Sequence, residues 1–163
     1  MEDFLLEIEH CCKEGKYYAA LFCSLAIPDI CGAAESKDGV ANGIKYAKWF
    51  DKYVAVREYS NYFSGEQCYR LRCGALHQGL TTHPKLGYER IIFVIKKRGV
   101  HLNILNDALN IDLVTFCSDI VTGAKMWLQI EAENPDVLKN LPNHLCFYYK
   151  GLGGYIEGAG LLT

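Results

Sequence analysis

An arginine and a histidine stand close together near the middle of the sequence, at a spacing that suits chemistry on a phosphate group. His77 follows Arg72 after four intervening residues, and it follows Arg70 after six. An imidazole can accept or donate a proton near neutral pH, whereas a guanidinium stays charged and can bind two phosphate oxygens at once. These residue types predict a phosphate-binding site with acid–base capacity.

The residues around this pair have the signals of a helix over about residues 65–77. Ser64 and Gln67 have the spacing of a capping box, in which each side chain bonds to the backbone of the other residue. Gly79 is a natural stop, because glycine readily adopts the left-handed conformation that ends many helices. The sequence therefore places the arginines and the histidine on one helix.

An ideal helix sorts the side chains of this segment onto two faces. Arg70, Cys73, Gly74 and His77 share the face opposite the apolar one, and Arg72 falls near the edge of the apolar face. This geometry brings Arg70 nearer to His77 than Arg72. A glycine in mid-helix costs ~1 kcal/mol relative to alanine. Gly74 therefore predicts that another surface approaches closely, such as a second helix, a second subunit or a substrate.

Other residues with chemical potential are weaker candidates. Cys73 and His77 are four residues apart and could form a nucleophile–base pair, but the sequence offers no third group to orient them. His10, Cys11 and Cys12 could bind a metal ion, but neighbouring side chains on a helix point about 100° apart, so core packing is favoured. Asp29 lies on another predicted helix and could orient the arginine or the histidine.

Composition indicates one soluble domain over residues 1–163, because half of the residues are hydrophobic and the net charge is only -2. We expect a cytoplasmic protein with no membrane span, since no apolar run reaches ~20 residues and the N-terminus is acidic. The eight cysteines contain no C-x-x-C pair. We interpret them as reduced thiols and expect neither metal nor cofactor.

The first half of the chain has the periodicity of three further helical pieces. Residues 2–31 contain two of them, separated at Gly15, and Pro28 should kink or end the second. In the next helix, Ile44, Ala47, Phe50 and Val54 repeat at helical spacing and predict its buried side.

The second half mixes strand and helix signals. Residues 90–95 and 100–104 are short apolar runs around the turn 96–99, which predicts a β-hairpin. A helix should follow over 112–131, capped by Asn110 or Asp112 and stopped by Asn134 and Pro135. The tail, residues 134–163, is rich in tyrosine and glycine and should drape over the body or fray. We predict a mainly α fold of four to five helices with a small β-hairpin insertion near 90–105.

The string Tyr69-Arg70-Leu71-Arg72-Cys73-Gly74-Ala75-Leu76-His77-Gln78-Gly79 resembles a known motif. It is similar to the R-x4-6-H motif of the HEPN superfamily (higher eukaryotes and prokaryotes nucleotide-binding). The predicted helices, with the motif at the end of one of them, resemble the HEPN fold too. The resemblance covers about residues 1–133, which would form the helical core of a single HEPN-like domain, and leaves out the tail.

The resemblance implies a homodimer in which two motifs meet in one cleft, acting as a metal-independent endoribonuclease. His77 would then be the general acid and base and Arg72 the phosphate clamp, with Arg70, Cys73, Gly74 and Asp29 in supporting or substrate-binding roles. The RNA 2′-OH would attack, leaving a 2′,3′-cyclic phosphate. The family also implies a role in toxin–antitoxin systems or phage defence, with an antitoxin as a partner protein.

The residues leave two alternatives open. The resemblance favours Arg72 as the functional arginine, whereas the ideal helix favours Arg70. Active members of the family often carry a polar asparagine, aspartate or histidine directly after the arginine, where this chain has Cys73. The second functional hypothesis is therefore a non-catalytic HEPN-fold module that binds RNA or a protein.

Overall fold

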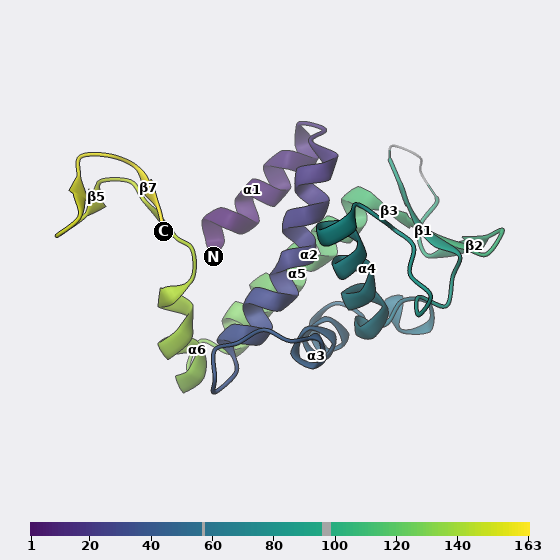
Figure 1. The fold of residues 1–163 in the computed structure, drawn as a ribbon, viewed down its shortest axis with the longest axis horizontal. Coiled ribbons are helices and arrows are strands. Elements are labelled where there is room, and N and C mark those ends of the chain that lie inside the picture. Colours follow the sequence, from purple (N-terminus) through teal and green to yellow (C-terminus); the bar gives the residue numbers. More distant parts are fainter. Residues whose placement is uncertain (57, 96–98) are drawn as a thin grey trace.

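A computed structural model describes residues 1–56, 58–95 and 99–163 of the chain. Helices form most of the structure and strands are short, which confirms the predicted mainly α class (Figure 1). The principal helices are α1 (Glu2–Lys13), α2 (Tyr17–Ala34), α3 (Gly43–Tyr53), α4 (Gly65–Gln78), α5 (Leu113–Ile130) and α6 (Pro135–Asn140). Two single-turn 3-10 helices are η1 (Tyr59–Asn61) and η2 (Leu141–Asn143).

Helix α2 is the centre of the bundle, because it packs against α1, α3, α4, α5 and α6. Within the described ranges it is also the one helix that is long and apolar enough, by length and composition alone, to cross a membrane. However, 56% of that 18-residue segment is buried inside the structure. The apolar character of α2 is therefore accounted for by its place in the core.

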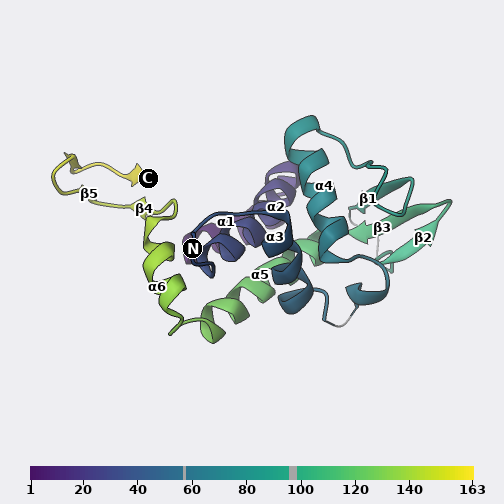
Figure 2. The same ribbon diagram turned by 60° about the horizontal axis from the view of Figure 1, so that its bottom comes forward.

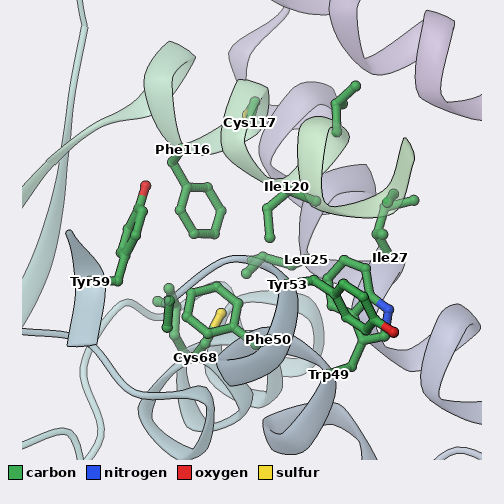
Figure 3. Packing of buried hydrophobic residues seen from close by; sticks show 14 of the residues in the cluster. Leu25, Ile27, Trp49, Phe50, Tyr53, Tyr59, Cys68, Phe116, Cys117 and Ile120 are labelled. Atoms are coloured by element: carbon green, nitrogen blue, oxygen red, sulfur yellow. The ribbon is translucent and has the colours of Figure 1, made fainter. Parts of the chain in front are cut away.

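Aromatic side chains fill the space between α3, α4 and α5 (Figure 3). Phe50 lies edge-on to both Tyr59 and Phe63, with ring centroids 5.9 Å apart in each pair. Trp49 and Trp127 are fully buried. Edge-to-face pairs of this kind add about 0.5–1.5 kcal/mol beyond the area they bury, so this cluster fixes α3 against the segment that leads into α4.

The buried side of α3 differs from the predicted one. Ile44, expected to face inward, is 82% exposed, whereas Tyr46, Trp49 and Tyr53 are buried with Phe50. Both sets repeat at helical spacing. The aromatic set is buried because its larger side chains remove more apolar area from water.

The predicted boundaries of the other early helices are largely confirmed. The chain turns between α1 and α2 at Gly15, whose φ is +73°. Helix α2 does not end at Pro28 but continues to Ala34. Proline removes one backbone hydrogen bond, and burial of the apolar residues that follow, Cys31 among them, compensates for that loss.

The strand region contains a three-stranded sheet whose order is β1 (Arg90–Val94), β3 (Ala108–Asp112), β2 (Asn103–Leu105). Strand β1 pairs with β3 in parallel, and β2 pairs with β3 in antiparallel fashion. The predicted hairpin over 90–105 is therefore wrong, since its two runs do not pair with each other. The basic part of its predicted turn, residues 96–98, lies outside the described residues.

The hairpin that does form joins β2 to β3 through Asn106 and Asp107, which have φ values of +50° and +57°. Asparagine and aspartate tolerate this left-handed conformation better than most residues, and it suits a two-residue hairpin turn. Strand β3 leads directly into α5, where Asp112 accepts a hydrogen bond from Thr115 N at 2.8 Å. Asp112 is thus the cap, and Asn110 lies in the strand.

Helix α5 ends at Ile130, before the predicted stop, and Asn134 caps a further helix, α6. This helix packs against α2, and Asn140 Nδ2 donates hydrogen bonds to Ala34 O and Ser36 O. The helical part of the chain therefore continues beyond residue 133, because Val137 is buried in the same core.

The last residues, 144–163, form what we call the C-terminal arm. Strand β4 (Phe147–Tyr148) pairs with β7 (Leu161–Leu162), and β5 (Gly151–Leu152) pairs with β6 (Ile156–Glu157). The arm extends away from the helices, on the side opposite the sheet (Figures 1 and 2). The tail was predicted to drape over the body or to fray, and it instead forms two short antiparallel ladders.

Candidate functional site

Helix α4 carries the predicted site, and its ends form as predicted. Ser64 and Gln67 make both hydrogen bonds of the capping box, and Gly79 ends the helix with φ +68°. The helix crosses α3 at short range, since a Cβ atom on Gly65 would lie 2.1 Å from Ala47 O. Helix α4 also packs against α2, so it has a fixed position relative to Asp29.

Arg72 joins the two other groups of the site. Its Nη1 atom lies 3.0 Å from Nε2 of His77, and its Nε atom lies 2.7 Å from Oδ2 of Asp29. Of the two candidate arginines, Arg72 is therefore the one beside the histidine. Asp29, Arg72 and His77 form a connected set that we call the Asp–Arg–His site.

The direction of the Arg72–His77 hydrogen bond follows from chemistry. A guanidinium has donors and no acceptor, so His77 must accept at Nε2. In this arrangement the imidazole is neutral and carries its proton on Nδ1. His77 is exposed, whereas Arg72 and Asp29 are partly covered. The imidazole of His77 therefore lies at the surface, and the guanidinium of Arg72 lies deeper, in contact with Asp29.

Asp29 is positioned by α2, one residue after Pro28. Its side chain is 14% exposed. Burial raises the pKa of Asp29 above its ordinary value of 3.8, while the charge and then the hydrogen bond of Arg72 act in the opposite direction. Burial is the larger effect, so Asp29 depends on Arg72 to remain ionised at low solvent exposure.

Tyr46 on α3 links the two helices that carry the site, and the sequence reasoning missed it. Its hydroxyl donates a hydrogen bond to Leu25 O at 3.1 Å, in the turn of α2 that leads to Asp29. The same hydroxyl lies 3.4 Å from Cys68 Sγ on α4, and its ring lies 5.4 Å from that of Tyr69. In the sequence, the one signal that could have identified Tyr46 is its helical spacing from Trp49 and Phe50.

Arg70, which the ideal helix favoured, points elsewhere. Its Nη2 atom lies 3.4 Å from Oε1 of Glu66, one turn earlier, and its guanidinium lies 6.0 Å from the ring centre of Tyr69. A helical wheel describes where a side chain leaves the backbone. Arginine is long enough to reach along the helix, and Arg72 uses that length to meet His77.

Cys73 lies on α4 beside Tyr69 rather than against the histidine. The pKa of Tyr69 is raised, mainly by a hydrogen bond with the Cys73 sulfur and to a smaller extent by burial. Among the residues that the structure describes, no hydrogen bond joins Cys73 to His77. The arrangement therefore gives no support to a cysteine nucleophile with a histidine base.

Gly74 makes room for the chain itself. A Cβ atom at this position would lie 2.9 Å from Leu80 O and 3.6 Å from Thr82 O. The chain turns back over the end of α4 after Gly79, and Leu80 N donates a hydrogen bond to Gly74 O at 3.1 Å. The close approach that glycine predicted is real, but the approaching surface is residues 80–82 of the same chain.

Metal-ligating side chains are dispersed over the described part of the chain, which holds no group of three or more His, Cys, Asp or Glu close enough to share an ion. His10, one of the weaker metal candidates, instead lies 2.7 Å from Glu14. Cys11 and Cys12 are half-buried thiols.

Comparison of the chain with protein families, with curated proteins and with solved structures finds no match. The functional interpretation is therefore based on the geometry of the Asp–Arg–His site and on the residue pattern that led to it.

Proposed function

We propose that this protein is a metal-independent endoribonuclease of the HEPN type, acting at the Asp–Arg–His site. The observation that carries the proposal is the contact between Arg72 and His77, which joins a permanent cation to an imidazole at the surface. A phosphodiester of RNA needs these two functions in one place, because a proton must leave the 2′-OH while negative charge builds on the phosphate.

In the proposed reaction, His77 acts as the general acid and base. A phosphate that binds Arg72 would compete for the Nη1 donor and release Nε2 of His77 as a proton acceptor. The 2′-oxygen then attacks phosphorus, and the 5′-oxygen leaves with a proton. The products are a 2′,3′-cyclic phosphate and a 5′-hydroxyl, and no metal ion takes part.

Arg72 acts as the phosphate clamp, and Asp29 positions it. Asp29 faces Nε of the guanidinium, so the amino groups at the other end are directed toward the surface, where His77 lies. We further propose that two copies bring their Asp–Arg–His sites into one cleft. An RNase of this kind suits a toxin or a phage-defence nuclease, held inactive by an antitoxin protein.

The test is RNA cleavage in the presence of EDTA. We expect His77→Ala to lower the rate by about 10²–10⁴-fold, the usual contribution of general acid–base catalysis. Arg72→Ala should lower it by about 10²–10³-fold, as loss of a transition-state charge partner does. Arg70→Ala is the matched control, because it removes an arginine from the same helix that pairs with Glu66 instead.

RNA with 2′-O-methyl groups provides a second control, since it lacks the nucleophile and must stay intact. Products of wild-type cleavage should carry the cyclic phosphate. The proposal is wrong if purified wild-type protein leaves RNA intact, or if His77→Ala cleaves as fast as wild type.

The alternative function is an RNA- or protein-binding module without catalysis. Cys73 favours it, because this position directly after Arg72 carries only a weak hydrogen-bonding group. A binding module would bind RNA with an affinity that falls steeply with salt, would lose affinity in Arg72→Ala, and would yield no cyclic phosphate.

A further inference from the structure

The C-terminal arm is ordered by its own contacts. The amide of Cys146 donates to Thr163 O at 2.7 Å and Thr163 N donates to Cys146 O at 3.1 Å, so both ends of the arm are joined at its base. The ring of Phe147 covers Gly160, where a Cβ atom would lie 2.9 Å from Cζ. The same ring meets that of Tyr149 edge-on, with centroids 4.7 Å apart.

The surface of this ordered arm is unusually apolar. Six large side chains are exposed, and Tyr155 reaches 85%. They are Leu145, Phe147, Tyr149, Tyr155, Ile156 and Leu162. Because one aromatic side chain carries about 150–250 Å², the six leave on the order of 600 Å² of mainly apolar area in water. The largest apolar patch on a soluble monomer is typically about 300–600 Å² and often binds something, so the surface of the arm is a candidate interface.

A hollow beside the arm lies on the same side of the molecule. It has a volume of about 430 Å³ and separates Tyr149 from helix α1. Leu6, which is 56% exposed, contributes its apolar wall, and the rest of the lining on α1 is polar: Asp3, Glu7, Glu9, His10 and Lys13. The chain thus carries an apolar projection and a cavity next to it.

We propose that the arm binds a second copy of this chain, in a reciprocal exchange in which each arm packs into the hollow along α1 of the other copy. This contact is separate from the cleft of the proposed ribonuclease, and it does not depend on that activity.

The exposed area of the arm suits a second copy better than an unrelated partner. A stable complex buries about 1,200–2,000 Å² in total. One arm against a foreign surface reaches the lower end of that range only if it is covered completely. A two-fold exchange uses both arms, so half coverage of each, roughly 300 Å² on each of four surfaces, already reaches about 1,200 Å².

Charge does not oppose the exchange. The ladder of β5 and β6 has one basic and one acidic residue: Lys150 directly precedes β5, and Glu157 ends β6. In the exchange each arm meets α1 of the other copy, so it brings one charge of each sign to a rim that holds acidic Asp3, Glu7 and Glu9 and basic Lys13. An arm that is already ordered also loses little conformational freedom on binding, so more of its apolar area contributes to affinity.

The test is the oligomeric state of full-length variants, measured by sedimentation velocity over a range of concentrations. The arm variant is Tyr155→Ser with Ile156→Ser. The matched control is Ile104→Ser with Leu105→Ser on strand β2, two neighbouring side chains that are also more than half exposed and lie on the opposite side of the molecule. We expect the arm variant to raise the dimer Kd at least about tenfold, and the control to leave it unchanged.

Leu6→Ser tests the receiving surface and should also raise the Kd. Wild-type protein that is monomeric at roughly 100 µM, well above a micromolar Kd, would overturn the proposal. So would an arm variant that dimerises as tightly as wild type. If dimerisation instead fails only in His77→Ala or Arg72→Ala, the α4 cleft is the interface, the arm exchange is wrong, and the proposed function is unaffected.

Discussion

The Nε atom of Arg72 lies 2.7 Å from Oδ2 of Asp29, so a carboxylate on α2 holds the guanidinium of α4. This contact selects Arg72 over Arg70 as the arginine that reaches His77. It also makes the direction of Arg72 depend on a residue that is distant in sequence.

Asp29→Asn should lower RNA cleavage by about 10²-fold, because an arginine that loses its orienting charge is displaced from the phosphate position. Substrate binding should weaken less than the rate, since the positive charge of Arg72 remains. Single-turnover cleavage measures this. The matched control is Glu66→Gln, which removes the carboxylate facing Arg70 and should leave the rate unchanged. Equal losses in the two variants would argue against a positioning role for Asp29.

Stability should change with pH through the same carboxylate. Burial raises the pKa of Asp29 in the folded chain above its value in the unfolded chain. The folded protein therefore binds the Asp29 proton more tightly, and this contribution to stability is present at low pH and lost as pH rises through the folded pKa. Relative to wild type, Asp29→Asn should gain free energy of unfolding between acidic and neutral pH in urea titrations. A constant difference across that range would contradict the assignment.

Helix α4 could be predicted because its signals are local. Ser64, Gln67 and Gly79 act within a few residues of the helix ends, and all three are confirmed. The strand region could not be predicted in the same way. The apolar run of β1 indicated a strand but not its partner, and the structure pairs it in parallel with β3, across a connection that contains β2.

The site was only partly predictable for a related reason. Arg72 and His77 stand in one motif, but Asp29 and Tyr46 meet them through the packing of α2 and α3 against α4. Two stripes of α3 repeat at helical spacing; the sequence pattern favours aliphatic Ile44 as a core residue, whereas the fold buries Tyr46. Spacing identifies a helix, whereas the choice of its buried face is made by neighbours far away in sequence.

Tyr46→Phe should separate positioning from stability. Loss of the hydroxyl removes its hydrogen bond to Leu25 O and should lower the free energy of unfolding by about 1 kcal/mol. The variant should also reduce cleavage, because the turn that carries Asp29 loses its tie to α3. Tyr53→Phe is the matched control: it loses a bond from the same helix, to Glu131 at 2.9 Å, but away from the site. We expect the two variants to be destabilised to a similar extent, and cleavage to fall only in Tyr46→Phe. Equal cleavage in the two variants would rule out the positioning role.

Gly74→Ala tests what the glycine in the motif is for. Alanine would gain ~1 kcal/mol of helix propensity, but its Cβ would lie 2.9 Å from the backbone oxygen of Leu80. Because backbone moves less readily than a side chain, we expect net destabilisation of about 1–3 kcal/mol and faster hydrogen exchange at the Leu80 amide, which bonds to Gly74 O.

Gly79→Ala is the matched control for this change, because its φ of +68° is strained for alanine, while among the described residues only its own chain neighbours lie within 4 Å of the added methyl group. It should cost about 1–2 kcal/mol through backbone conformation alone. Urea unfolding and hydrogen exchange distinguish the two variants, since Gly74→Ala must displace residues 80–82 and Gly79→Ala need not. If Gly74→Ala kept full stability and normal exchange at Leu80 but lost self-association, the glycine would serve contact with a second copy, and the intrachain explanation would be wrong.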